Sequence, residues 1–226
     1  MMSEFFEPPP PAPPEPEPPP TPPWFSAPRG MLPGVIPAEL LLARTDEVAV
    51  CVTRLAAYTT GFEFEIRTLA APGRRDLDLD PMLFGPHRHR LRRPGSAEAM
   101  PDQMLRFGVQ FADGRKATNT GGFHHGEDPP PGPVMHEGGG GGGGGDWRQS
   151  EWVWPLPPPG PVAFVCEWPA ARIPLSRAEI DAQIILDAAA RARPIFPDDR
   201  GPRGQSSSRS TTAFASAPEP SSSSSD

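Results

Sequence analysis

The chain has 226 residues and a net charge of −7, from 21 Lys and Arg residues against 28 Asp and Glu residues. An acidic protein has no general attraction to nucleic acid or to anionic membranes, so either kind of binding would need a local basic patch. The 36 Pro and 23 Gly residues bring the composition close to that of low-complexity chains. The residues that can form a core are therefore concentrated in a few stretches, and we expect one domain.

Low-complexity segments bracket this predicted domain. Twelve of the 16 residues in 8–23 are proline, and such a segment adopts extended polyproline II, which serves as a spacer or a docking strip. The C-terminal segment is rich in Ser and too poor in apolar residues to offset its ordering entropy. We predict a disordered Pro-rich arm over 1–23, a single β domain over 24–197 and a disordered Ser-rich tail over 198–226.

The sequence predicts neither a secretion signal nor a membrane span. Residues 1–23 lack the basic and apolar regions of a signal peptide, and no apolar run reaches about 18 residues. The two cysteines, Cys51 and Cys166, are too few for a disulfide scaffold and form no C-x-x-C pair. We expect a cytoplasmic protein that contacts no membrane and holds no cofactor.

Alternating apolar and polar residues predict antiparallel strands in the first half of the domain. Residues 48–53 and 62–67 alternate on either side of the turn signal Thr59-Thr60-Gly61, a pattern typical of a hairpin with one buried face. An earlier strand is predicted over 35–42, where a proline favours an edge position. Residues 72–102 are polar and rich in Pro, Gly and Arg, and they are predicted to form a long loop.

A second hairpin follows this loop. Residues 105–111 alternate cleanly and run into Asp113-Gly114, a common two-residue hairpin turn, with 115–120 as the returning strand. Residues 121–146 include eight consecutive glycines. Glycine loses more conformational freedom on folding than any other residue, so we predict a second long loop over 121–146 without a packed element.

The C-terminal part of the domain is predicted to contain a third hairpin and one helix. Residues 151–154 are expected to pair with 162–168 across a Pro-rich loop. Ser176 and Glu179 have the spacing of a helix capping box, and Pro194 ends the helix. The apolar stripe that should pack this helix on the sheet comprises Ile180, Ile184, Ile185 and Ala188. The whole pattern predicts a mainly β fold, an antiparallel β-sandwich or strongly curved sheet with one C-terminal α-helix.

Three segments resemble a family of uncharacterised actinobacterial proteins. They are LRFGVQFADGR at 105–115, the glycine run before a tryptophan, and WVWPLPPPGP at 152–161. The resemblance covers residues 24–196. That family has no assigned activity, so the resemblance implies no site.

The tryptophans offer a candidate binding surface. Trp152 and Trp154 share one face of a predicted strand, and Trp168 is expected to lie across from them. These residues could be the core and rim of a sandwich face, or a surface for a protein partner, since Trp beside a Pro-rich loop is typical of interfaces. The leading hypothesis is a non-enzymatic β-sandwich binding or scaffolding module with the tails as spacers.

The competing hypothesis is a metal-dependent or other enzyme. His87 and His89 form an H-x-H pair that could seed a metal site, but the arginines at 88–93 would repel a divalent cation. All five histidines fall in the two predicted loops, and no nucleophile with a positioned base can be assembled from the sequence. The enzyme hypothesis rests on the frequent role of long loops in function. Nucleic-acid binding through the arginines at 88–93 is a third hypothesis, which lacks the support of interleaved aromatic residues or a recognised fold.

Overall fold

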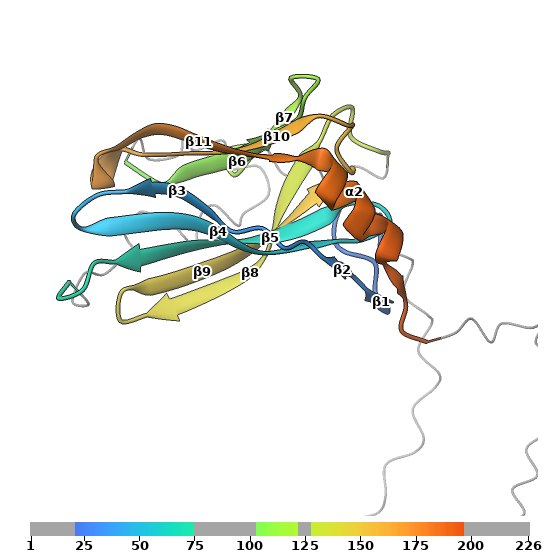
Figure 1. The fold of residues 1–226 in the computed structure, drawn as a ribbon, viewed down its shortest axis with the longest axis horizontal. Helices are drawn as coiled ribbons and strands as arrows, with labels where there is room; N and C mark the ends of the chain where they lie inside the picture. Colours follow the sequence, from blue (N-terminus) through green and yellow to red (C-terminus); the bar gives the residue numbers. More distant parts are fainter. Residues whose placement is uncertain (1–20, 75–102, 122–127, 197–226) are drawn as a thin grey trace, which may run out of the picture. The chain divides into compact units, whose positions relative to one another are not determined.

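The computed structural model describes residues 21–74, 103–121 and 128–196, which fold as two packed antiparallel sheets with one helix near the C-terminal end (Figure 1). This confirms the predicted fold class. The expected Ser-rich tail and nearly all of the expected Pro-rich arm and of the loop at 72–102 lie outside the described residues. No helix in the described part of the chain is both long and apolar enough to cross a membrane.

The larger sheet has the strand order β2-β4-β5-β9-β8, and β3 also pairs with β4. Its strands are β2 (Gly34–Val35), β3 (Leu40–Arg44), β4 (Val48–Ala57), β5 (Phe62–Ala70), β8 (Val134–Gly143) and β9 (Asp146–Trp154). The first predicted hairpin is confirmed as β4 and β5, whose alternate residues are buried. The strand predicted over 35–42 is instead two short edge strands, because the chain leaves the sheet around Pro37 before it returns to β4.

The smaller sheet has the order β11-β10-β6-β7. Its strands are β6 (Arg106–Gln110), β7 (Lys116–Thr118), β10 (Pro161–Trp168) and β11 (Ile173–Asp181). The second predicted hairpin is confirmed, with Gly114 at a φ of 86° in the turn. The third is wrong: β9 pairs with β5 and β8, whereas β10 pairs with β6 and β11. Residues 155–160 therefore connect the two sheets, because each strand finds its partners elsewhere in the chain.

The glycine run forms most of β8, so the prediction of a long loop over 121–146 is wrong for Val134–Gly143. The strand pairs with β9 as far as Gly143 opposite Asp146, and the turn between them uses Gly144 and Gly145 at φ values of 60° and 81°. Every second residue of the run must be glycine because β9 lies too close to leave room for a Cβ atom. A Cβ added at Gly140 would lie 2.8 Å from the Arg148 carbonyl oxygen, and one added at Gly142 would collide with the main chain of Asp146 and Trp147.

The helix α2 (Ala182–Arg191) begins five residues later than the capping box predicts. Ser176 belongs to β11, opposite Cys166 of β10, and its hydroxyl bonds the Pro174 carbonyl. The residue at the helix N-cap is Asp181, whose carboxylate accepts a hydrogen bond from the Gln183 N–H at 2.9 Å. Pairing with β10 therefore outweighs the local capping signal. The helix lies beside β2 and β4 (Figure 1).

The helix buries one stripe, made of Ala182, Ile185, Ala188 and Ala189. The predicted stripe is confirmed for Ile185 and Ala188, which are buried, and for Ile184, which is partly buried and packs against the core. It is wrong for Ile180, which lies on β11 and not on the helix. Gly34 of β2 makes the close packing possible, since a Cβ there would collide with the Ala188 carbonyl.

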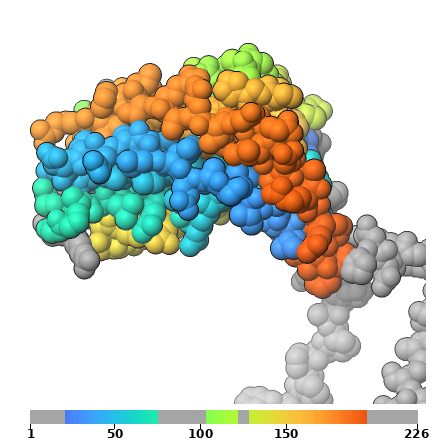
Figure 2. Space-filling view, viewed as in Figure 1, coloured from blue at the N-terminus to red at the C-terminus, as the bar shows by residue number. Residues whose placement is uncertain are grey.

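The core lies between the two sheets. Phe64 of β5 meets Phe164 of β10 edge to face, with ring centroids 5.2 Å apart. The edge strands β3 and β11 lie side by side, and Figure 2 shows this flank of the sandwich closed by packed atoms. A separate two-stranded pairing of β1 (Met31–Leu32) with β12 (Arg193–Pro194) ties the end of the helical segment to the start of the sandwich.

Candidate functional site

The outer face of the larger sheet carries an aromatic surface at one end of β9. Trp152 and Trp154 share this face because alternate residues of a strand point the same way, while Val153 between them is fully buried in the core. Trp152 lies opposite Glu63 of β5 and His136 of β8. The pairing therefore places these groups on the outer face of the sheet, away from the interior between the sheets.

Tyr58 completes the aromatic surface, which we define as Tyr58, Trp152 and Trp154. The Tyr58 ring meets the Trp152 ring edge to face at 5.6 Å. Its hydroxyl donates a hydrogen bond to Glu63 Oε1 at 3.2 Å. Gly61 allows the approach, because an added Cβ would lie 2.7 Å from Trp152 Cζ2. The glycine that signals the turn in the sequence thus also makes room for an aromatic ring.

The environment of Tyr58 keeps its hydroxyl protonated. Burial, followed by the charge and the hydrogen bond of Glu63, raises the pKa of Tyr58 to about 12. Burial also raises the pKa of Glu63, and the hydrogen bond from Tyr58 opposes that shift. The pair is therefore a donor and acceptor fixed at the edge of the aromatic surface.

A segment of the same chain covers this surface. Residues Pro22 to Phe25 form a turn in which the Phe25 N–H donates to the Pro22 carbonyl at 3.0 Å. The Trp152 indole N–H donates to the Pro23 carbonyl, also at 3.0 Å, across 129 residues of sequence. Trp24 packs edge to face against Trp154 with ring centroids 5.9 Å apart. Trp24 and Trp152 are consequently only 8% and 4% exposed.

Pro23 is also the last residue of the proline-rich run that the sequence predicts to be an arm. The aromatic surface therefore binds the chain at Pro23, where the proline-rich run meets the folded domain. Two residues further along the chain, the Phe25 ring packs with its centroid 5.5 Å from that of the His136 ring.

Trp168 does not belong to this surface. It is on β10 in the smaller sheet, is fully buried and is part of the core between the sheets. The prediction that it lies across from Trp152 is wrong because β9 and β10 are not partners.

The histidines divide between described and undescribed parts of the chain. His87 and His89, and the arginines at 88–93, lie outside the described residues. The prediction that every histidine is in a loop is wrong for His136, which is on β8 and is buried next to Phe25. Within 21–74, 103–121 and 128–196, no three His, Cys, Asp or Glu side chains are grouped as a metal site would require.

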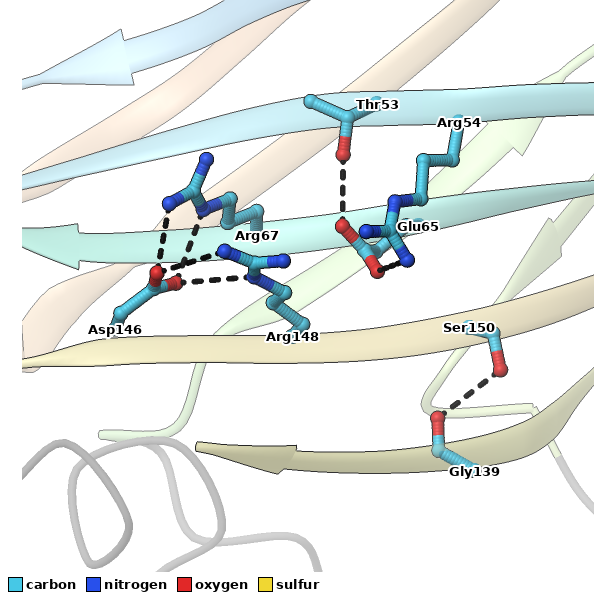
Figure 3. Close-up of polar contacts among 8 residues, drawn as sticks. All are labelled: Thr53, Arg54, Glu65, Arg67, Gly139, Asp146, Arg148 and Ser150. Carbon is cyan, nitrogen blue, oxygen red and sulfur yellow. Dashed lines mark hydrogen bonds and ion pairs between the residues drawn. The ribbon is translucent and has the colours of Figure 1, made fainter. Parts of the chain in front are cut away.

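The far end of the same outer face is charged (Figure 3). Asp146 accepts hydrogen bonds from Arg67 at 2.6 Å and from Arg148 at 3.0 Å, and these two arginines hold the pKa of its carboxyl well below the usual range. Glu65 accepts from Thr53 at 3.0 Å in the same region. Arg67–Asp146 and Thr53–Glu65 join neighbouring strands, and Arg148 binds Asp146 within β9. These polar groups satisfy one another, and we assign them a structural role in holding β4, β5 and β9 together.

One buried carboxyl group inside the sandwich is not predicted by the sequence. Glu151 is 2% exposed on the inner face of β9 and accepts a hydrogen bond from Gln149 at 2.5 Å. Burial raises the pKa of Glu151 to about 8, the Gln149 hydrogen bond lowers it, and the charge of Glu137 raises it further. Glu151 lies on the same face of β9 as the buried Val153. Its burial could not be predicted, because a single Glu next to a tryptophan is ordinarily expected to face solvent.

The cavity nearest to these inner polar groups is small. It has a volume of about 20 Å³ between the sheets, and its lining includes Thr68, Gln149 and the apolar side chains of Ile66 and Leu105. Such a space holds about one water molecule. It is too small for an organic substrate.

Comparison with protein-family models, with curated proteins and with solved structures finds no match to this chain. The resemblance to an actinobacterial family therefore stays a prediction.

Proposed function

We propose that this chain is a non-enzymatic β-sandwich module that binds other proteins through its aromatic surface. One observation carries the proposal: Trp152 and Trp154 hold a stretch of polypeptide, Pro23-Trp24, on the outer face of a sheet by one hydrogen bond and one ring contact. Tyr and Trp are enriched at protein interfaces because each combines a large apolar ring with a hydrogen-bond donor.

The chemistry of the described residues favours binding over catalysis. Glu151, whose pKa is raised to about 8, is enclosed between the sheets, and its partner Gln149 lines a cavity that holds about one water molecule. His136, the histidine within the described part, lies under Phe25. Within 21–74, 103–121 and 128–196, no group of side chains favours the enzyme alternative.

We also place the module in the cytoplasm. Cys51 and Cys166 are both free thiols, which accords with a reducing compartment.

Selection from a random peptide library tests the function. Because the chain covers its own aromatic surface, the bait is full-length protein carrying Trp24→Ala, which removes the ring that packs on Trp154. The matched baits add either Trp154→Ala, on the surface, or Leu175→Ala, which is 72% exposed on the other sheet.

We expect peptides that bind the Trp24→Ala chain and its Leu175→Ala derivative but are lost with Trp154→Ala. A library that yields no peptide dependent on Trp154, with all baits folded by circular dichroism, would refute the function.

A further inference from the structure

We infer that the ligand of the aromatic surface is a proline-rich segment of another protein in which two prolines precede an aromatic residue, and that the chain's own Pro22-Pro23-Trp24 occupies the surface in its place. This inference rests on the proposed function. It names the partner's chemistry, and it adds that binding in trans competes with a contact within the chain.

The direction of the hydrogen bond between the surface and Pro23 suits a proline-rich ligand. A proline has no N–H, so a proline-rich segment offers its partner only carbonyl acceptors. The surface meets this with a donor, the Trp152 indole N–H, placed 3.0 Å from the Pro23 carbonyl. Aromatic-lined grooves that bind proline-rich peptides use the same complementarity of donors and ring faces.

The residue after the prolines is buried against the aromatic surface. Trp24 is 8% exposed, and its ring meets Trp154 edge to face. An aromatic side chain buried in this way is the kind of anchor that dominates protein interfaces. The turn closed by the Phe25 N–H and the Pro22 carbonyl directs Trp24 onto Trp154. The pair of prolines thus sets the geometry and the aromatic residue fills the site.

The composition of the sequence before Trp24 also matches the inferred ligand. The 16 residues of 8–23 contain twelve prolines, so the segment leading to the surface is of the same chemical class as the ligand we infer. Proline-rich chains lose little entropy on binding because they are already extended. Since the occupant is tethered, it competes at a high effective concentration, and a partner must displace it.

A labelled peptide with the sequence of residues 18–26 is the probe, titrated by fluorescence anisotropy. We expect it to bind the full-length Trp24→Ala chain about tenfold or more tightly than the wild type, whose surface is filled. Adding Trp154→Ala should weaken binding about tenfold or more, as loss of an interface anchor does. A peptide with alanine at the Trp24 position should bind equally weakly, while adding Leu175→Ala to the protein should change nothing.

Several results would overturn the inference. One is a folded Trp24→Ala chain that does not bind the peptide, and another is binding that ignores Trp154. A third is light scattering that shows wild-type dimers which Trp24→Ala dissolves, because the segment would then serve a second copy of the chain. If Trp24→Ala does not fold, Trp24→Val replaces it and keeps an apolar side chain against Trp154. Should the library yield Trp154-dependent peptides without the two prolines and aromatic residue, the inference fails while the proposed function stands.

Discussion

Neighbouring glycines of β8 should respond to alanine with opposite signs. A Cβ added at Gly142 would collide with the main chain of Asp146 and Trp147, whereas one added at Gly141 meets no atom within 4 Å. Neither glycine has a positive φ, so strain of that kind does not separate them. The two substitutions are chemically identical and differ only in which way the methyl group points.

The size of the difference follows from two known effects. Forcing a methyl group into an occupied space costs about 1–3 kcal/mol, because β9 must move away. Gly141→Ala instead gains about 0.4–1 kcal/mol, since alanine restricts the unfolded chain more than glycine does. At roughly 3 °C per kcal/mol for a domain of this size, the melting temperature should fall by about 3–9 °C for Gly142→Ala and rise by about 1–3 °C for Gly141→Ala.

Differential scanning calorimetry of the full-length wild type and both variants at one pH measures this difference. The control is Gly143→Ala, where an added Cβ also meets open space and where a result like that of Gly141→Ala is expected. If all three variants changed the melting temperature alike, the register of β8 on β9 would be wrong. The register would also be wrong if Gly141→Ala lowered the melting temperature more than Gly142→Ala.

The remaining predictions concern the core. Ile185→Asp should destabilise the chain by about 3–5 kcal/mol in urea unfolding, independently of protein concentration, because Ile185 is fully buried; Ala190→Asp, exposed on the same helix, should cost at most about 1 kcal/mol. Folding raises the pKa of Glu151 from 4.5 to about 8, so its contribution to stability is complete below pH 4.5 and is lost as the pH rises through 8. The free energy of unfolding of the wild type should therefore fall from pH 5 to 9 relative to Glu151→Gln, and parallel curves would contradict the burial. Cys51 should react with a thiol reagent before Cys166, which is 1% exposed and whose pKa burial raises to about 12; equal rates in the folded protein would mean that β10 is not in the core.

Local sequence predicted the elements in which alternation and turn residues agree. The β4–β5 hairpin needs only its apolar face and the turn before Phe62, and the β6–β7 hairpin needs only the Asp113-Gly114 turn. Both signals lie within about 20 residues of sequence, so no distant partner has to be known. The helix was anticipated from the stripe around Ile185, although its start was not.

Pairing between distant segments determines where the helix begins and why the glycine run is a strand, which local sequence patterns do not predict. Ser176 has good capping chemistry, but the backbone of 173–181 pairs with β10 instead, and the cap passes to Asp181. The glycine run has no side chains from which burial or register can be predicted, and only β9 makes it a strand. In these places the favourable hydrogen bonds come from segments that local patterns do not identify.

Local sequence predicts two residues of the candidate site, and distant pairing decides the rest. Trp152 and Trp154 were singled out because two tryptophans with a spacing of two share a strand face. The predicted pairing of 151–154 with 162–168 wrongly places Trp168 on the same surface. The group that covers the surface could not be foreseen, because Pro23 and Trp152 are 129 residues apart and a proline carbonyl has no sequence signature as an acceptor.

The central claim is that the chain's own Pro23-Trp24 occupies the aromatic surface, and NMR of the full-length protein tests it most directly. The Trp152 indole N–H signal can be assigned by its loss in Trp152→Phe. We predict that this proton exchanges slowly with water, that Trp24→Ala makes it exchange at least about tenfold faster, and that Trp24 and Trp154 ring protons show cross-relaxation, as their 5.9 Å centroid separation requires. Fast exchange of the wild-type Trp152 indole proton, together with no cross-relaxation between the Trp24 and Trp154 rings, would contradict the account.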